Sequence, residues 1–518
     1  MSRFNPSKTA MPEAKETNLA GGAVYPQDPE LELAQVLLTS FCNDMYYESF
    51  DAKTERFRTA IGRCSPEYVA KASIYARDKF NMRSITHLCA VELCRFIHNC
   101  VPPNGHPWLR TYFRTLPRRV DDITEILACW ESLGEKSRPS AMIRGLGDAF
   151  AKFDGYQLAK YRGEGKKVSL IDAVRLCHPV PTDKNRDALA ALVVGTLKQK
   201  RTWEAKVSAA GGDKEKKSEA WAEMVNSGQL GYFALLRNLR NIAEHAPEAV
   251  QEAYRQLVDE NAIRKSRVFP FRFYTAIKTL MTAAIQAQDG FTARSLRLVA
   301  QGCDAAMKKS LANVPDLPNT LVAVDVSGSM NNAVSSGNLT LAEAGMLFGV
   351  ALAEKGYTNL MRFASDAVYA HYMPGGSIAA TVEAQSRCEG VGGHGTNFHA
   401  ILEKAGKRYD RIVVFSDMQC WMEGNEQNRF RSNIYGYAHA ENVGFGKTYE
   451  TYCRKWDVKP WVYLVNLADQ GGAPLPQEHP KVVTLAGWSE KLFDLMAMAE
   501  QDPHALKTAI WETRLDYS

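Results

Sequence analysis

The sequence predicts a multidomain protein, in which an all-α region of helical repeats is followed by an α/β domain with a doubly wound parallel sheet. Helical periodicity without alternating strands predicts the first part, residues 23–312. The second part, residues 319–518, is predicted by a buried strand that runs directly into polar residues at Leu321–Met330 and by the strands and helices that alternate after it. The chain has 518 residues, of which 45% are hydrophobic, and this is enough for two or more sizeable cores.

The amino-terminal region begins with residues 1–22, which are mostly polar and which we expect to be a flexible segment without a cleavable signal. Ser65, Pro66 and Glu67 then form a helix start, because Ser can cap a helix and Pro is tolerated at its first position. Apolar residues recur at helical spacing in Leu189–Leu197 and Leu235–Ile242. Helices that bury one face only against neighbouring helices form an α-solenoid, which is the predicted architecture even though no strict repeat period is present.

Charge is distributed unequally along the chain. Residues 1–310 contain 46 Lys and Arg against 35 Asp and Glu, whereas residues 311–518 contain 17 against 23. The basic density is high in residues 160–206, and such a surface can neutralise the phosphates of a nucleic acid. A solvated helical surface is the alternative on composition alone. Pro315 and Pro318 interrupt helix between the two regions and mark the boundary.

The second region begins with a candidate metal site. Leu321–Val324 is an apolar strand of the kind that is buried on both faces, and Asp325, Ser327 and Ser329 follow it at alternate positions. Two later segments, the glycine-rich Gly392–Thr396 and the strand Ile412–Ser416 ending at Asp417, should return to the same edge of the sheet. Carboxylate and hydroxyl oxygens are ligands for a hard divalent cation, and Mg²⁺ is the expected one.

Further elements of a doubly wound domain follow this strand. The pattern predicts a helix over Leu339–Glu354, ended near Gly356, and strands over Leu360–Phe363, Trp461–Asn466 and Val482–Leu485.

Other chemistries fit the metal segment poorly. A haloacid-type phosphatase needs a second Asp where Ser327 stands, and a phosphate-binding loop needs a Gly-Lys-Ser/Thr that Gly390–Thr396 lacks. A Mg²⁺ site of oxygen atoms does not need imidazole, so we expect His394 and His399 to lie on the loop surface. No activated nucleophile or paired carboxylates occur elsewhere, and the chain is not expected to be an enzyme.

The order Asp325, Ser327, Ser329, Thr396 and Asp417 resembles the metal-ion-dependent adhesion site of von Willebrand factor A domains, which have a Rossmann-like fold. The resemblance implies that Ser327, Ser329 and Thr396 touch the metal. It also implies that Asp325 and Asp417 hold the metal directly or through water, and that one coordination position is left for an acidic group of a partner.

Cysteine usage bears on the compartment of the protein. Eleven cysteines are scattered without a repeating spacing and no apolar run of about 20 residues occurs, so we expect reduced thiols and a cytoplasmic location without membrane attachment. One cluster could be drawn as zinc ligands, but it lacks a paired Cys-x-x-Cys, and buried thiols with satisfied histidines are the favoured interpretation. Its members are His87, Cys89, Cys94, His98 and Cys100.

Three segments of the helical region, Ala173–Pro179, Phe233–Ile242 and Lys265–Leu280, together with the linker and AVDVSGSM, resemble the TROVE proteins of the Ro autoantigen family. The resemblance covers roughly residues 20–518. It implies a monomeric ring of HEAT-like repeats closed by the A domain. It further implies binding of small Y RNAs on the outer surface and of single-stranded ends of misfolded RNA in the central hole. In bacterial relatives a Y RNA tethers the ring to an exoribonuclease, polynucleotide phosphorylase.

Two sets of basic residues are the candidate RNA contacts. The family's Y RNA contacts correspond to a basic segment followed by Arg-Leu-x-His, and the transfer is firmer for His178 than for the basic residues of the preceding loop. This first set consists of Lys160, Arg162, Lys166, Lys167, Arg175 and His178. His178 before Pro179 could alternatively serve only to cap a helix.

The second set is interleaved with Phe269, Phe271, Phe273 and Tyr274, which could stack on unpaired bases but are expected to pack in the core. Its charges are expected to face the cavity or solvent, and its basic residues are Arg237, Arg240, Arg264, Lys265, Arg267 and Arg272.

These patterns favour an RNA-binding ring scaffold that acts in noncoding RNA quality control or degradation. The alternative is a metal-dependent protein-interaction scaffold without RNA function.

Overall fold

The structure is a computed structural model that describes most of the chain. The described residues are 16–17, 23–25, 28–39, 50–100, 106–134, 137–161, 165–197, 213–228, 230–334, 339–419, 445–468, 474–475, 481–487, 491–502 and 504–515. By packing, the chain divides into two compact units. We call Asp28–Asp44, Ser49–Gly211 and His504–Ser518 the helical unit, and Met1–Gln27, Met45–Glu48 and Gly212–Pro503 the mixed unit.

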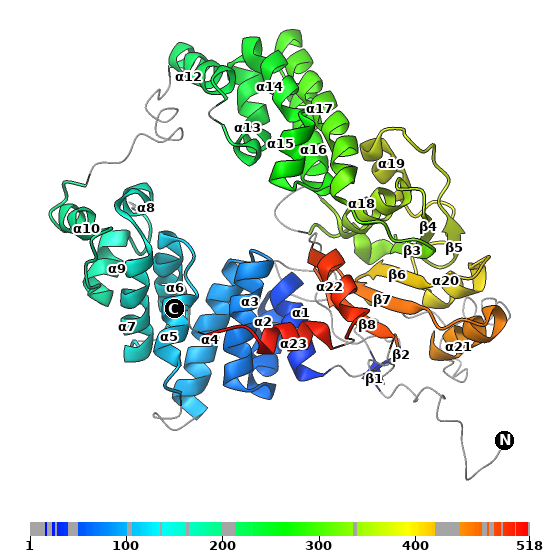
Figure 1. Ribbon diagram of the computed structural model, residues 1–518, viewed down its shortest axis with the longest axis horizontal. Helices are drawn as coiled ribbons and strands as arrows, with labels where there is room; N and C mark the ends of the chain where they lie inside the picture. The colour runs from blue at the N-terminus through cyan, green and yellow to red at the C-terminus, as the bar shows by residue number, and fades with distance from the viewer. Residues whose placement is uncertain are drawn as a thin grey trace. The chain divides into compact units, whose positions relative to one another are not determined.

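The helical unit consists of short helices, each packed mainly on helices close to it in sequence (Figure 1). Ser65 caps α3 by accepting a hydrogen bond from the Tyr68 amide at 3.2 Å, and Pro66 is the first residue of that helix, which confirms the predicted start. The helices are α1 Pro29–Thr39, α2 Phe50–Arg63, α3 Pro66–Lys79, α4 Ser84–Cys100, α5 Leu109–Thr115, α6 Val120–Ser132, α7 Ser140–Ala149, α8 Gly155–Lys160, α9 Leu170–Cys177 and α10 Arg186–Val193. This neighbour-to-neighbour packing is that of helical repeats, as predicted.

A buried ionic network holds three of these helices together. The carboxylate of Asp122, which is fully buried, accepts from Arg77 at 2.9 Å and from Arg83 at 2.8 Å. It also accepts from the backbone amides of Arg118 and Arg119. Burial alone raises the pKa of Asp122, but the hydrogen bond with His87 and the charge of Arg77 hold it well below its usual range. The charged form of this carboxyl is therefore part of the folded structure.

One helix of the helical unit comes from the far end of the sequence. Helix α23, Ala505–Trp511, packs on α3. The Trp511 indole lies 5.3 Å from the ring of Tyr68 and donates to Glu30 at 3.2 Å. Lys507 pairs with Asp28 and Glu30 at 2.8 and 2.7 Å. The sequence placed these residues in the α/β domain, residues 319–518, whereas by packing they belong with α1 and α3.

The mixed unit combines a second group of helices with the sheet. The helices are α12 Lys214–Asn226, α13 Tyr232–His245, α14 Val250–Leu257, α15 Glu260–Ser266, α16 Pro270–Gln286 and α17 Gly290–Ser310. Helix α16 is fixed to α18, Leu341–Ala353, because Glu343 accepts from Tyr274 and Lys278, each at 2.8 Å. Phe271 of α16 packs against Phe348 of α18 at 5.5 Å between ring centroids.

The sheet of the mixed unit has six strands in the order β5-β4-β3-β6-β7-β8, and every pair is parallel except β4 with β5. The strands are β3 Thr320–Asp325, β4 Thr358–Phe363, β5 Ala367–Tyr369, β6 Arg411–Ser416, β7 Trp461–Asn466 and β8 Val482–Ala486. The remaining helices are α19 Ile378–Gln385, α20 Phe398–Lys404, α21 Phe445–Trp456 and α22 Lys491–Ala499. The predicted doubly wound parallel sheet is confirmed, with β5 as an antiparallel edge strand that the sequence reading did not include.

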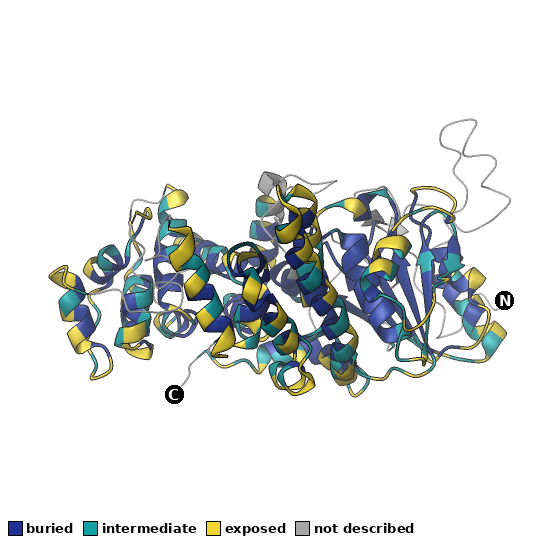
Figure 2. Ribbon diagram, turned by 90° about the horizontal axis from the view of Figure 1, so that it is seen from above, coloured by how far each residue is buried: buried dark blue, intermediate teal, exposed yellow. Residues whose placement is uncertain are grey.

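Strand β3 is buried on both faces, as its uninterrupted apolar run predicted. Leu321 and Ala323 belong to the core cluster that includes α20 and α21, whereas Val322 and Val324 face α18. The approach on the α18 side is close, since a Cβ atom on Gly349 would lie 2.5 Å from the Leu360 side chain. Figure 2 shows the buried strands between their covering helices.

Residues 1–22 lie mostly outside the described residues. Within them, β1 Glu16–Thr17 pairs antiparallel with β2 Ala23–Val24, and Val24 joins the core cluster of the sheet. None of the described helices is long and apolar enough to cross a membrane.

Candidate functional site

The carboxyl ends of β3 and β6 bring together four of the five predicted metal ligands. Asp325 ends β3 and accepts from the backbone amide of Ser327 at 2.9 Å. The hydroxyls of Ser327 and Ser329 lie 3.4 Å apart, and the Ser329 hydroxyl is bonded to the carboxylate of Asp417. All four side chains are at most 4% exposed. Two carboxylates and two hydroxyls therefore form one buried oxygen cluster.

Ser416, which the sequence analysis did not single out, ties the two strands together at this cluster. Its hydroxyl donates to Asp325 at 2.6 Å and accepts from the Met418 amide at 3.0 Å. Met418 adopts a left-handed conformation, with φ of 62°. A hydroxyl directly before the aspartate at a strand end was the available signal for this role.

Thr396, the fifth predicted ligand, lies on a glycine-rich loop that is anchored to the same edge. The carbonyl of His394 accepts from the Gly328 amide at 3.2 Å, and the amide of Gly395 donates to Ser365 at 3.0 Å. Gly392 and Gly393 adopt φ values of 77° and 123°, which side chains other than glycine rarely adopt. Thr396 is 2% exposed.

The electrostatics of the cluster suit a divalent cation. Burial raises the pKa of Asp325 to about 7, and the charge of Asp417 adds to this effect. Burial also raises the pKa of Asp417, although its hydrogen bond with Ser329 opposes the change. Two buried carboxylates that repel each other are stabilised by a bound cation, and the available oxygen atoms match the preference of Mg²⁺. Asp325, Ser327, Ser329, Thr396 and Asp417 would hold such an ion, which stays a prediction.

The two histidines beside Thr396 differ in their surroundings. His394 is exposed, as expected, and lies 3.3 Å from the sulfur of Cys388. The surface position predicted for His399 is wrong, because this residue is 5% exposed and its ring bonds to Thr448 at 2.7 Å. Its position in the first turn of α20 carries it under α21, and burial lowers its pKa to about 4.

Three members of the cysteine and histidine cluster of α4 are buried, whereas His98 is exposed and the side chain of Cys100 lies outside those described. His87 is buried beside Asp122 at 3.3 Å, and Cys89 and Cys94 are buried thiols whose pKa values burial raises, to about 12 in the case of Cys94. Across the part of the chain that the structure describes, no three His, Cys, Asp or Glu side chains are grouped to hold a metal. The candidate cation site therefore depends on its hydroxyl oxygens.

The first set of predicted RNA contacts lies in the helical unit. Arg175 is exposed on α9, and His178 directly follows this helix with an exposed side chain. The backbone of His178 also caps α9, since its φ is 47° and its amide bonds to the Val174 carbonyl at 3.0 Å. The capping alternative and a surface role of the imidazole are thus compatible.

The basic residues that precede α9 differ in their exposure and in their contacts. Lys166 and Lys167 are exposed, and Lys166 pairs with Glu125 at 3.0 Å. Lys160 is half-buried at the end of α8, with its ammonium 5.6 Å from the Tyr161 ring. Arg162 lies outside the described residues.

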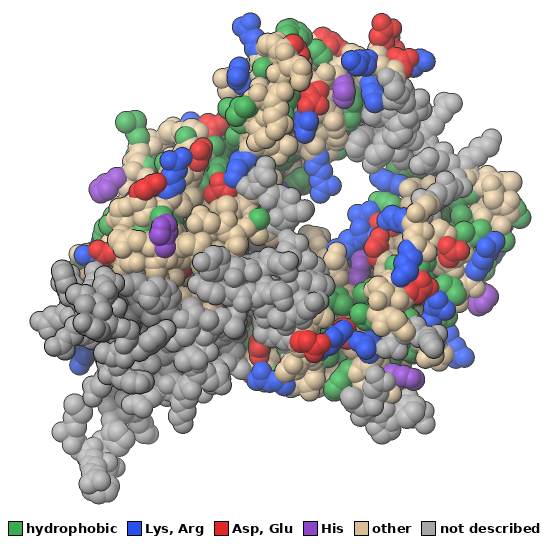
Figure 3. All heavy atoms as spheres, turned by 180° about the vertical axis from the view of Figure 1, so that it is seen from behind, with side chains coloured by type: hydrophobic (Ala, Val, Ile, Leu, Met, Phe, Trp, Pro, Cys, Tyr) green, Lys and Arg blue, Asp and Glu red, His purple; other side chains and the backbone are tan. Residues whose placement is uncertain are grey.

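The second set lies in the mixed unit, and its six basic residues are exposed. Arg240 pairs with Glu244 at 2.8 Å, and Arg267 ends α15 in a left-handed conformation. Three of the four aromatic residues pack in the core, as expected, because Phe271, Phe273 and Tyr274 are at most 5% exposed. Phe269 is half-buried and stacks on Phe271 at 5.8 Å between ring centroids. On the face drawn in Figure 3, basic and acidic side chains are interspersed.

Comparison with known proteins gives a consistent set of matches. The sequence model of the family described as "TROVE domain" matches residues 35–195 and 194–314. Telomerase protein component 1 of Rattus norvegicus is 22% identical over 315 residues, and that of Mus musculus is 24% identical over 304 residues. These matches cover 43% and 42% of this chain, and the chain spans only 11% of the length of either relative.

Among solved structures, the crystal structure of the Deinococcus radiodurans Ro (RSR) protein matches with a TM-score of 0.54 and 18% identity. The match covers 90% of this chain and 98% of that one, so the two chains share one fold from the helices to the sheet.

Proposed function

Because this chain belongs to the TROVE-domain family, whose members bind RNA, we propose that it is an RNA-binding scaffold without catalytic chemistry of its own. It binds a small structured Y-like RNA on the outer surface of its helical repeats. It also takes single-stranded ends of misfolded or structured RNA in the cavity of a ring that these repeats and the α/β domain form. The role is quality control or degradation of noncoding RNA.

The observation that carries this proposal is the presentation of Arg175 and His178. Both side chains are exposed at the carboxyl end of α9, while the buried face of that helix, with Leu170, Ala173 and Cys177, fixes the helix in the unit. A guanidinium on a rigid helix can contact phosphate, and an adjacent imidazole can contact a base or a phosphate. A rigid helix end therefore carries two RNA contacts at a defined spacing.

The arginines of the mixed unit support the second part of the proposal. Arg237, Arg267 and Arg272 are exposed, while Phe271, Phe273 and Tyr274 are buried in the core. Exposed guanidinium groups can bind the RNA backbone, and the exposed ring of Phe233, on the same helix as Arg237, can stack on a base. Such contacts suit single-stranded ends of many sequences.

The oxygen cluster of the α/β domain has a separate task in this proposal. It is the metal-ion-dependent adhesion site of a von Willebrand factor A domain, and with Mg²⁺ it binds an acidic group of a protein partner. An exoribonuclease, such as polynucleotide phosphorylase, is the partner class that a Y-like RNA would bring to a cytoplasmic monomeric ring.

The test is sequencing of RNA crosslinked to the tagged protein, with the double variant Arg175→Ala, His178→Ala. Arg186→Ala is a control for the loss of one exposed arginine, since Arg186 is also exposed in the helical unit and pairs with nearby Asp183 at 3.3 Å. We expect one small structured RNA to be enriched by the wild type and the control and lost from the double variant. No RNA above background with the wild type would contradict the proposal.

The second candidate function is a metal-dependent protein-interaction scaffold without RNA function. The buried oxygen cluster favours it, because that cluster is built independently of any basic surface. Capture of a protein by RNA-free material only when Mg²⁺ is present, together with no RNA in the crosslinking experiment, would establish this alternative.

A further inference from the structure

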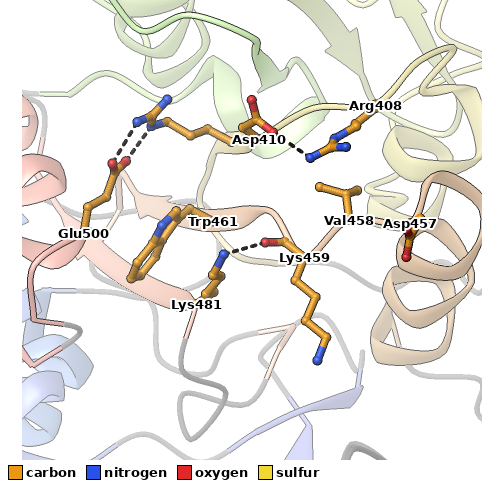
Figure 4. Close-up of a pocket in the computed structure, with 9 residues that line it drawn as sticks. Arg408, Asp410, Asp457, Val458, Lys459, Trp461, Lys481 and Glu500 are labelled. Atoms are coloured by element: carbon orange, nitrogen blue, oxygen red, sulfur yellow. Dashed lines mark hydrogen bonds and ion pairs between the residues drawn. The ribbon is translucent and has the colours of Figure 1, made fainter.

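A cavity of about 370 Å³ opens at the edge of the sheet opposite the oxygen cluster. It is lined at the amino ends of β6, β7 and β8 by Arg411, Trp461 and Lys481, with Arg408, Lys459 and Glu500 around them (Figure 4). Strand β6 runs from Arg411 to Ser416, so the cavity and the oxygen cluster are separated by the length of that strand, roughly 17 Å. The cavity is therefore a separate place in the fold.

Basic side chains converge on this cavity although the surrounding region is acidic. Residues 311–518 contain 17 Lys and Arg against 23 Asp and Glu. Four of these basic residues line the cavity, against three acidic ones, which are Asp410, Asp457 and Glu500. The overall composition of residues 311–518 therefore does not explain why basic residues outnumber acidic ones at this cavity.

Part of that charge is compensated within the cavity. Arg411 forms a two-point contact with Glu500, at 2.5 and 2.8 Å. Arg408 is exposed, and its guanidinium nitrogen lies 3.7 Å from a carboxylate oxygen of Asp410, which is long for an ion pair. The same carboxylate also accepts a hydrogen bond from Asn319 at 2.8 Å. Lys459 is exposed as well. Arg408 can therefore meet an anion from solvent, and Lys459 lies at the rim with its side chain directed away from Arg408 (Figure 4).

One wall of the cavity is aromatic. The indole of Trp461 is only half-buried and is held in place by the fully buried ring of Tyr463, at 6.2 Å between centroids and 15° between planes. The ammonium of Lys481 lies 5.8 Å from the indole and donates to the Lys459 carbonyl at 2.9 Å. A fixed aromatic ring beside cations is the arrangement that stacks a nucleobase while its phosphate is neutralised.

We propose that this cavity binds a nucleotide unit of single-stranded RNA, with the base against Trp461 and the phosphate near Arg408, and with Lys459 adding positive charge at the rim. The inference rests on the proposed RNA-binding function and extends it to the α/β domain. An acidic peptide would pair with the same cations but would not require a stacking contact with Trp461. A free mononucleotide shares the required chemistry, so the test includes it.

The experiment uses the full chain and a single-stranded RNA containing 4-thiouridine, crosslinked by light and mapped by mass spectrometry. The double variant Arg408→Glu, Lys459→Glu reverses two charges at the cavity. The control Lys404→Glu, Lys447→Glu makes the same charge change at two exposed lysines outside it. We expect a crosslink on the peptide that contains Trp461 in the wild type and the control. In the cavity variant we expect its loss and RNA affinity weaker by about tenfold.

The outcomes separate this inference from the function on which it rests. RNA bound with equal affinity by the wild type and the cavity variant, without a crosslink at Trp461, would overturn the inference alone. Absence of RNA binding by the wild type would overturn both. Loss of the crosslink in the presence of excess AMP supports a nucleotide site, whereas loss with polyglutamate but not with AMP would overturn it in favour of an acidic peptide.

Discussion

The hydroxyl of Ser416 donates a 2.6 Å hydrogen bond to the carboxylate of Asp325, so the ends of two neighbouring strands meet at one buried acid. Strands β3 and β6 pair in parallel, and this register brings Asp417 to the same edge as Asp325. In that arrangement the two buried carboxylates repel each other, and a bound cation would relieve the repulsion.

Metal binding should therefore stabilise the mixed unit. With Mg²⁺ at about one hundred times its dissociation constant, we expect stabilisation of about 2.7 kcal/mol, measured as a rise in the thermal unfolding midpoint over that in EDTA. Asp417→Asn should abolish the Mg²⁺ effect and should unfold in EDTA no earlier than the wild type, because it removes the repulsion with Asp325. Equal midpoints of the wild type with and without Mg²⁺ would argue against the site.

Acid should destabilise the mixed unit through His399. Burial lowers the pKa of this imidazole from 6.5 to about 4, so its contribution to stability is fully present above pH 6.5 and is lost as the pH falls towards 4. From pH 8 to pH 5 we expect a loss of about 2 kcal/mol from this group. Urea unfolding at both pH values measures it. His399→Gln should show a smaller loss over the same interval, and an identical loss would contradict the assignment.

The buried network of the helical unit should be sensitive to loss of one partner. Asp122→Ala leaves Arg77 and Arg83 without their shared carboxylate, and we expect a loss of about 3–5 kcal/mol in the free energy of unfolding. Asp148→Ala is the matched control, since Asp148 also pairs with an arginine, Arg110, but on the surface. That control should have a much smaller effect, because solvent screens the pair. Equal effects in thermal unfolding would show that burial of the network is not the cause.

Helix α23 should contribute to the stability of the helical unit. Ile510 is 1% exposed, and Ile510→Ala should lower the free energy of unfolding of that unit by about 2–4 kcal/mol. Lys507→Ala, which removes a more exposed ion pair with Asp28 and Glu30, should cost about 1 kcal/mol or less. Hydrogen exchange of the amides of α3 locates the effect. Unchanged exchange in Ile510→Ala would mean that α23 does not support α3.

The sequence predicted those elements whose signal is local. Strands β3, β6 and β7 were predicted nearly in full, because central parallel strands bury both faces and so appear as unbroken apolar runs. Strand β5 was not, since an edge strand of three residues, Ala367–Tyr369, carries too little pattern. The burial of His399 and the place of α23 depend on packing with distant segments, which no local pattern encodes.

The candidate site also combines residues that a local pattern predicts with residues that depend on distant segments. Asp325, Ser327 and Ser329 were predictable because they follow a recognisable strand, whereas Ser416 acts through its neighbour in the sheet, 91 residues away. The cavity at the opposite edge gathers Arg408, Lys459 and Lys481 from three separate connections. No spacing in the sequence marks such a group.

The packing of α23 also has a consequence for how the protein is made. Helix α10 ends at Val193 and α23 begins at Ala505, so the ribosome must translate Gly212–Pro503 of the mixed unit between them. At about 5–20 residues per second this interval is on the order of 15 to 60 s. Helices α1 to α10 therefore emerge well before α23, and the surface of α3 on which α23 packs stays open to chaperones until Ala505–Trp511 has been translated.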